Sequence, residues 1–230
     1  MSTLSELRTR ARRRADAVGN NFFSDAEIND YINVGLGELY DVLVAKQEDY
    51  FVSSVSFSLI NGQDAYSFSS IGLNNFYKAL AVDSVQGNDT FRIKRFSIAD
   101  RNRYQSNVAF HNSRGYADYE YSIQGNEIKF VPEPSAGDSI TLWYVPKCAK
   151  LEADSDKLDS RINSNWEEYI IILAAIKMRQ KEETSVTSLE RDLERIVLRI
   201  EEAASNRDSA EPFGITDESV GVLQGFWSLS

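Results

Sequence analysis

"NFFSDAEINDYINVGLGELYDVLV" (residues 21–44) has the pattern of one long amphipathic helix with a marked beginning. Ser24 and Glu27 are spaced as a capping box, in which the serine hydroxyl accepts an amide of the first turn and the glutamate reaches back to the serine amide. Phe23 and Ile28 lie where a hydrophobic staple forms across such a start. The inner face repeats at the 3.6-residue period through Ile28, Ile32, Gly35, Leu36, Leu39 and Leu43. We therefore expect a helix over residues 25–46.

The residues before this stretch predict another helix, over residues 3–17. Thr3 and Glu6 repeat the capping-box spacing, and Gly19 is placed to end the helix. The apolar face comprises Leu4, Leu7, Ala11, Ala15 and Val18. Because the connection is short, we expect the two helices to form an antiparallel hairpin.

From residue 50 the apolar residues alternate with polar ones, which indicates strands. "YFVSSVSFSLINGQDAYSF" (residues 50–68) places Val55, Phe57 and Leu59 on one side and serines on the other. Turn signals follow at residues 87–89, 125–126 and 134–137. Residues 50–147 therefore predict an antiparallel β module, a small sandwich or barrel.

The last third of the chain returns to the helical period. A charged linker is expected over residues 148–162, and Ser164 with Glu167 gives another capping-box spacing before the nearly all-apolar "YIIILAAI" (residues 169–176). A further amphipathic stripe runs to about residue 206. The expected fold class is α+β: a bundle of residues 1–47 and 163–206, with the β module inserted and an extended tail at 207–230.

Composition excludes several classes of protein. The 230 residues are 42% hydrophobic and carry a net charge of -10, which argues against general nucleic-acid binding through a broad basic surface. The single cysteine, Cys148, excludes an internal disulfide and a cysteine-built zinc site, which favours synthesis in a reducing cytoplasm. We see no apolar run long enough to cross a membrane and no secretion signal.

No group of residues has the spacing of a catalytic or metal site. His111 and Cys148 lack a nucleophile-elbow pattern, and there is no phosphate-binding glycine loop. Asp154, Asp156 and Asp159 fail the EF-hand spacing and are better explained as a solvated linker. We therefore expect no enzyme activity, no cofactor and no metal.

The basic residues of the first helix are the strongest local charge. Arg8, Arg10, Arg12, Arg13 and Arg14 spread over most of the helix outside its apolar face. This distribution suits several ionic neighbours better than one flat phosphate-binding stripe, although contact with DNA stays open.

The order of motifs resembles the head-to-tail adaptor (head completion, connector or neck) proteins of tailed bacteriophages. The resemblance lies in "TLSELRTRARRRAD" (residues 3–16), "FFSDAEINDYINVGLGELYDVLV" (22–44), "RIKRFSIADRNRY" (92–104) and "GNEIKFVPEPSAGDSITLWYVP" (125–146). It covers residues 3–205 and leaves the tail uncovered.

The resemblance implies a structural virion protein without catalytic residues. Such proteins form a ring of identical subunits, commonly twelve, which connects the portal of the filled head to tail or neck proteins and lines the channel through which DNA passes. Two other classes stay open. One is a monomeric DNA- or ligand-binding module using the basic first helix, and the other is an enzyme with a site around His111 or Cys148.

On this basis we expect three groups of interface residues. Arg8, Arg12 and Arg13 would contact an acidic neighbour, either the next subunit or the portal. The loop 107–117 would use Arg114 and Tyr116 to face the channel or the next tail component. The tail 211–230 would bind another subunit or the portal through Phe213, Phe226 and Trp227, since exposed apolar clusters mark interfaces.

Overall fold

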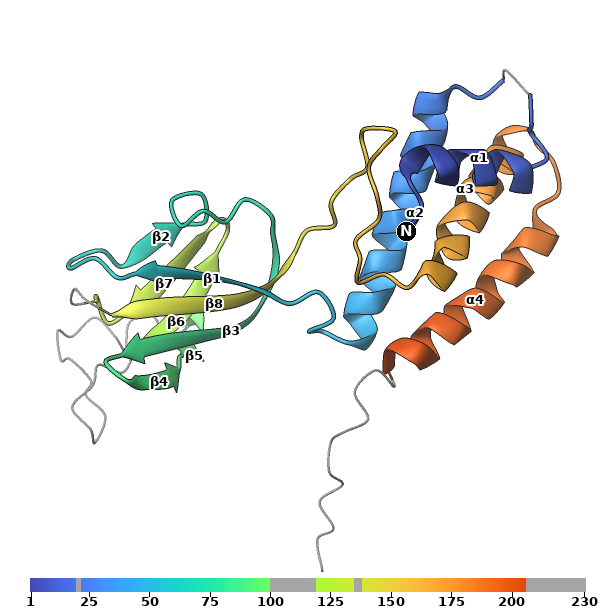
Figure 1. The fold of residues 1–230 in the computed structure, drawn as a ribbon. Coiled ribbons are helices and arrows are strands. Elements are labelled where there is room, and N and C mark those ends of the chain that lie inside the picture. Colours follow the sequence, from blue (N-terminus) through green and yellow to red (C-terminus); the bar gives the residue numbers. More distant parts are fainter. Residues whose placement is uncertain (20–21, 100–118, 135–137, 206–230) are drawn as a thin grey trace, which may run out of the picture.

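The computed structural model of the chain describes residues 1–19, 22–99, 119–134 and 138–205. Within these ranges the helices form one body and the strands another, with the strands inserted between the two helix pairs (Figure 1). Each body has its own cluster of buried apolar side chains. The predicted α+β fold with an inserted β module is confirmed, and the module has two open sheets, as in a sandwich.

The first two helices begin close to the predicted residues. Helix α1 (Leu4–Arg14) has the complete capping box of Thr3 and Glu6. Helix α2 (Asp25–Lys46) is capped by the Ser24 hydroxyl, which accepts from the amide of Glu27. The Glu27 carboxylate is used elsewhere: it accepts hydrogen bonds from Tyr31 and from Lys181 of the third helix. Of the predicted capping box, the structure therefore contains the hydrogen bond to the Ser24 hydroxyl, while the Glu27 carboxylate has other partners.

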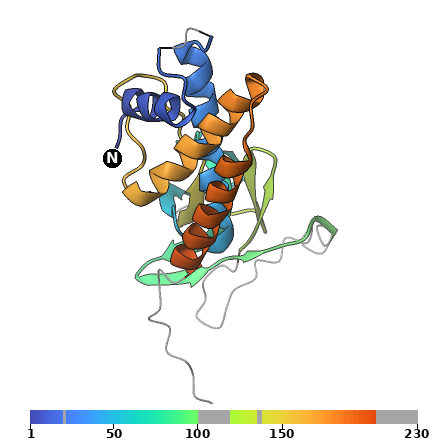
Figure 2. The same cartoon turned by 90° about the vertical axis from the view of Figure 1, so that its right-hand side faces the viewer.

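Helix α3 (Glu167–Lys181) lies at the centre of the helical body. Ten of its fifteen residues are buried, as its all-apolar pattern predicts. It contacts α1, α2 and the amphipathic α4 (Thr187–Ser205); α1 crosses it in Figure 1 and lies beside it in Figure 2. Its start differs from the prediction, because Asn163 caps a preceding 3₁₀ turn, η2 (Ser164–Trp166). The two terminal helix pairs thus share one core.

Helices α2 and α3 approach each other closely at a glycine. A Cβ atom built on Gly35 would lie 3.3 Å from both the Cα and the carbonyl oxygen of Ile170. These are backbone atoms, so they cannot rotate away as a side chain would. The absence of a side chain at position 35 therefore sets how closely the two helices pack.

The β module contains two four-stranded sheets. Their orders are β1–β8–β3–β4 and β2–β7–β6–β5, and every pair is antiparallel except the two-residue contact of β5 with β6. The strands are β1 (Ser53–Ser58), β2 (Ala65–Ser67), β3 (Phe76–Gln86), β4 (Asp89–Arg92), β5 (Lys94–Arg95), β6 (Glu120–Gln124), β7 (Glu127–Val131) and β8 (Ser139–Pro146). The residues buried between the sheets include Val82, Ile128, Phe130, Ile140 and Leu142.

The segment 148–162 packs on the helical body. Leu151, Leu158 and Ile162 are buried in the helical core. Asn33 of α2 exchanges two hydrogen bonds with the backbone of Leu151, and the amide of Leu4 donates to the carbonyl of Asp156. Leu151, Leu158 and Ile162 are covered while Glu152, Asp154 and Lys157 are exposed, so this stretch is a packed segment and not a solvated linker. No described helix is both long and apolar enough to cross a bilayer.

Two glycines of α2 provide a matched test of the packing. Gly37→Ala should raise the free energy of unfolding by about 0.5–1 kcal/mol, because its Cβ would meet nothing within 4 Å and alanine is the better helix former. Gly35→Ala should instead lower it by roughly 1–3 kcal/mol through overpacking against Ile170. Urea unfolding of both variants measures the difference. Equal stability of the two variants would contradict this packing.

Candidate functional site

One side of α1 is bound to the start of α2. The Nε and Nη2 atoms of Arg8 lie 3.6 Å and 3.0 Å from carboxylate oxygens of Asp25 and Asp154. Arg12 Nη2 lies 2.9 Å from Asp25 and donates to the carbonyl oxygen of Phe23. The Arg12 hydrogen bond, aided by the charges of Arg8 and Arg12, holds the pKa of Asp25 below its ordinary value. These contacts fix α1 to the capped end of α2.

The other side of α1 is bound to α3 through a buried carboxylate. Glu167 is only 3% exposed. Arg10 Nη1 lies 2.7 Å from Glu167 Oε2, and the backbone amide and hydroxyl of Ser2 donate to the same carboxylate at 2.9 Å and 2.6 Å. Because the buried charge is both paired and hydrogen-bonded, its burial is compensated.

The electrostatics of Glu167 are the balance of two opposing effects. Burial raises the pKa of this carboxyl, whereas the hydrogen bonds from Ser2 and Arg10 and the charge of Arg10 lower it. The second group of effects is larger, so the pKa lies below its ordinary value and the carboxylate stays ionised near neutrality.

A further ion pair continues the network to the last helix. Arg14 Nη2 lies 2.7 Å from Asp192 of α4, and its Nε lies 3.9 Å from Glu168 of α3. Arg10 also approaches Glu168, at 3.5 Å. Four arginines of α1 therefore contact carboxylates from α2, α3, α4 and the segment 148–162, which makes α1 the electrostatic centre of the helical body.

The structure divides the predicted interface residues into three groups. Arg8 and Arg12 contact carboxylates of their own chain, whereas Arg13 is exposed and has no ion pair with any described residue. Arg114, Tyr116, Phe213, Phe226 and Trp227 lie outside the described residues, as does His111. Sequence reasoning anticipated several ionic neighbours for α1 but not that most belong to the same chain.

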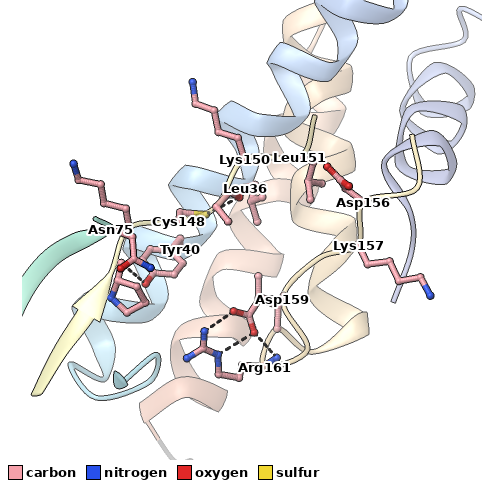
Figure 3. Close-up of a pocket in the computed structure, with 14 residues that line it drawn as sticks. Leu36, Tyr40, Asn75, Cys148, Lys150, Leu151, Asp156, Lys157, Asp159 and Arg161 are labelled. Carbon is pink, nitrogen blue, oxygen red and sulfur yellow. Dashed lines mark hydrogen bonds and ion pairs between the residues drawn. The ribbon is translucent and has the colours of Figure 1, made fainter. Parts of the chain in front are cut away.

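A pocket of about 340 Å³ lies where the β module meets the helical body (Figure 3). Tyr40 of α2, Asn75 and Cys148 line one end, and the ion pair of Asp159 with Arg161 lines the other. Burial raises the pKa of the Cys148 thiol to about 11, assisted by the charges of Asp41 and Asp159. The thiol is therefore protonated at neutral pH, a state unsuited to nucleophilic attack.

The three aspartates of the segment 148–162 hold the segment in shape. Asp154 contacts Arg8, Asp156 accepts from the amides of Glu152 and Ala153, and Asp159 contacts Arg161. Across the described ranges, no three residues of the types His, Cys, Asp and Glu are grouped so as to hold a metal ion. These carboxylates therefore act as acceptors for amides of the segment itself and as ion-pair partners of Arg161 and of Arg8 in α1.

The comparisons with known proteins give one finding. A family model described as SU10 adaptor protein matches residues 2–212, which include both helix pairs and the β module. No curated protein matches the chain.

The buried ion pair predicts different effects for two arginines of the same helix. Arg10→Ala should lower the free energy of unfolding by about 1–3 kcal/mol, because it leaves the buried Glu167 carboxylate without its cation. Arg13→Ala is the matched control and should change it by less than about 0.5 kcal/mol, as is usual for an exposed residue. Thermal and urea unfolding measure both. Arg13→Ala being as damaging as Arg10→Ala would contradict the network.

Acid should destabilise the helical body. The folded pKa values of Asp25 and Glu167 lie below their ordinary values, so the unfolded chain binds more protons as the pH falls through the region of about 4. The stability that these groups contribute is present above the unfolded pKa and is lost below it. We expect the free energy of unfolding to fall between about pH 5 and pH 3, and to fall less steeply in Glu167→Gln. A pH-independent stability over this range would contradict the assignment.

Proposed function

The chain belongs to the SU10 adaptor protein family, and from this we propose that it is a structural protein of a bacteriophage virion whose subunits form a ring between the portal of the filled head and the tail. The resemblance to phage head-to-tail adaptors predicted from the sequence is confirmed at the level of the family. The family match is the observation that carries the proposal. We further propose that the ring has twelve subunits, as is common in such proteins, and that it lies in the neck.

The helical body supports this function because it is organised in advance of assembly. Each ion pair of α1 joins two elements, and the buried Glu167 contact ties the beginning of the chain to α3. A subunit whose helices are already fixed loses little conformational freedom on entering a ring. Such a subunit can be added to a ring repeatedly without refolding at each addition.

The two bodies offer separate surfaces for separate partners. The helical body and the β module have separate cores, and the module projects away from the helices (Figure 1). Contacts between the two bodies include Tyr77 with Asp41 and Lys78 with Glu48. We assign self-association to the helical body and contact with tail or neck proteins to the β module. The tail residues Phe213, Phe226 and Trp227 and the loop residues Arg114 and Tyr116 are proposed contacts with the portal, the next subunit or the tail.

The charge of the chain suits a passage for DNA. A net charge of -10 repels the phosphate backbone, so DNA would move through the ring without being retained. The alternative, a monomeric module that binds DNA through α1, is less well supported. Arg8, Arg10, Arg12 and Arg14 are already paired with carboxylates, which leaves Arg13 as the unpaired cation of that helix among the described residues.

Assembly state tests the proposal directly. Purified protein should bind the portal of its own phage as a symmetric oligomer, measured by native mass spectrometry of the mixture and of each component alone. The control is the same measurement with duplex DNA in place of portal, over a series of salt concentrations. A chain that stays monomeric with portal and binds DNA with steep salt dependence would support the DNA-binding alternative instead.

A further inference from the structure

The exposed face of α2 is acidic. Between residues 30 and 45, its outward-facing residues recur at the helical period and include three carboxylates and no cation: Asp30, Val34, Gly37, Glu38, Asp41 and Ala45. Within the described structure these carboxylates have weak partners only. Asp30 has none, and Glu38 and Asp41 accept hydrogen bonds from tyrosine hydroxyls at 3.4 Å and 3.1 Å. These three carboxylates therefore have no ion pair with a cation of the described part of their own subunit.

The exposed half of α4 has two flanks of opposite charge. At about 100° per residue, Arg191, Arg195 and Arg199 form one flank, and Glu190, Glu194 and Glu201 form the other. Glu201 pairs with Lys46 of α2, so the acidic flank is the one turned toward α2 of the same subunit. The basic flank is turned away from it. It also carries two carboxylates, Glu202 and Asp192, and Asp192 pairs with Arg14 of α1.

The cations of the basic flank are available for an outside partner. All three arginines are exposed; Arg191 and Arg199 have no ion pair with a described residue. Arg195 has a single 3.8 Å contact with Asp192 and remains 78% exposed. Leu198, which is 67% exposed, lies beside them and adds an apolar side chain that nothing in the described subunit covers.

The two faces match in spacing as well as in charge. Arg191 and Arg199 are eight residues apart, as are Asp30 and Glu38, and both separations correspond to about 12 Å along a helix axis. Val34, which is 43% exposed, lies between the two carboxylates, as Leu198 lies among the arginines. Next to Val34 the surface is open, since a Cβ on Gly37 would meet nothing within 4 Å.

We propose that the basic flank of α4 in one subunit packs along the acidic face of α2 in the next copy of the chain. Arg191, Arg195 and Arg199 would face Asp30, Glu38 and Asp41, with Leu198 against Val34 and Gly37. This interface rests on the proposed ring and identifies its contact surfaces.

The geometry favours a ring over a closed dimer. The two faces belong to different helices on different sides of α3 (Figures 1 and 2), so each subunit would use one face toward each neighbour. An interface between unlike surfaces propagates until the rotation closes.

The energetics explain how such a modest surface can suffice. An exposed ion pair contributes little to affinity and mainly sets orientation and partner choice. In a closed ring every subunit is held by two interfaces, so breaking one contact does not release it, and the effective affinity exceeds that of a single contact. The interface should therefore weaken with salt as a whole.

Two charge-reversed proteins test the interface. The first carries R191E, R195E and R199E, and so has acidic faces on both α4 and α2. The second carries D30K, E38K and D41K, and so has basic faces on both. Each alone should associate at least tenfold more weakly than wild type, whereas an equimolar mixture should assemble in alternation. Native mass spectrometry and light scattering measure this, with circular dichroism to verify folding.

A matched control reverses the opposite flank of α4. E190K with E194K reverses two charges on the same helix, against three in the arginine variant, and should leave assembly unchanged. If this control weakens assembly as strongly as the arginine variant does, or if the two reversed proteins fail to assemble when mixed, the interface is overturned. An arginine variant that assembles normally but loses affinity for duplex DNA would identify DNA, and not a second copy, as the occupant.

Cysteine cross-linking provides a test that changes no charge. With Cys148→Ser as the background, V34C and L198C together should give a ladder of disulfide-linked oligomers on oxidation, while either alone should not. If the wild-type protein forms a ring but the V34C/L198C variant gives no ladder, this interface is wrong while the proposed adaptor ring is unaffected. Wild-type protein that stays monomeric both alone and with portal would reject the interface and the proposed function together.

Discussion

The apolar helix α3 is the constraint on which the structure depends, because it must be covered on nearly every side. No single neighbour can do this. Helices α1 and α2 come from the beginning of the chain, α4 from the end, and residues 148–162 add Leu158 and Ile162 to the same core. The β module is thereby left as an insertion between segments that are far apart in sequence and adjacent in space. Gly35 lies against the backbone of Ile170 and sets how closely α2 packs on α3.

The arginines of α1 fix the positions of the elements that pack around α3, because apolar contacts alone are not directional. Arg10 reaches the buried Glu167, Arg14 reaches Asp192, and Arg8 reaches Asp25 and Asp154. With unpaired cations, α1 would attract nucleic acid. Because most of its arginines are paired, it instead holds the helices of its own subunit together. Among the described residues, α2 and α4 each carry a group of charges without an ion pair of their own subunit or with only a weak one, and those faces are where we place the contacts of the assembled protein. Internal pairing and external recognition thus use different faces of α2 and α4.

The sequence alone predicts the elements but not their ionic partners. Periodicity identifies α2, α3 and α4, and the unpaired apolar faces of both terminal hairpins require a shared core. Local spacing is less reliable for charged residues. Glu27 and Glu167 both fit a capping box, yet they pair with Lys181 and with Arg10 and Ser2, which lie more than 150 residues away in the chain. The segment 148–162 reads as a charged linker because its buried residues, Leu151, Leu158 and Ile162, follow no period. The partners of these residues are set by tertiary contacts, which a local sequence pattern cannot predict.

The central claim is that rigid, identical subunits associate through unlike helix faces to join the head of a phage to its tail. A cryo-EM reconstruction of the protein bound to its portal measures this most directly. The account predicts a rotationally symmetric ring on the portal, with the helical body of each subunit unchanged and α4 against α2 of its neighbour. A reconstruction in which the chain binds as isolated subunits, or in which α1 has left Glu167 to contact DNA, would contradict it.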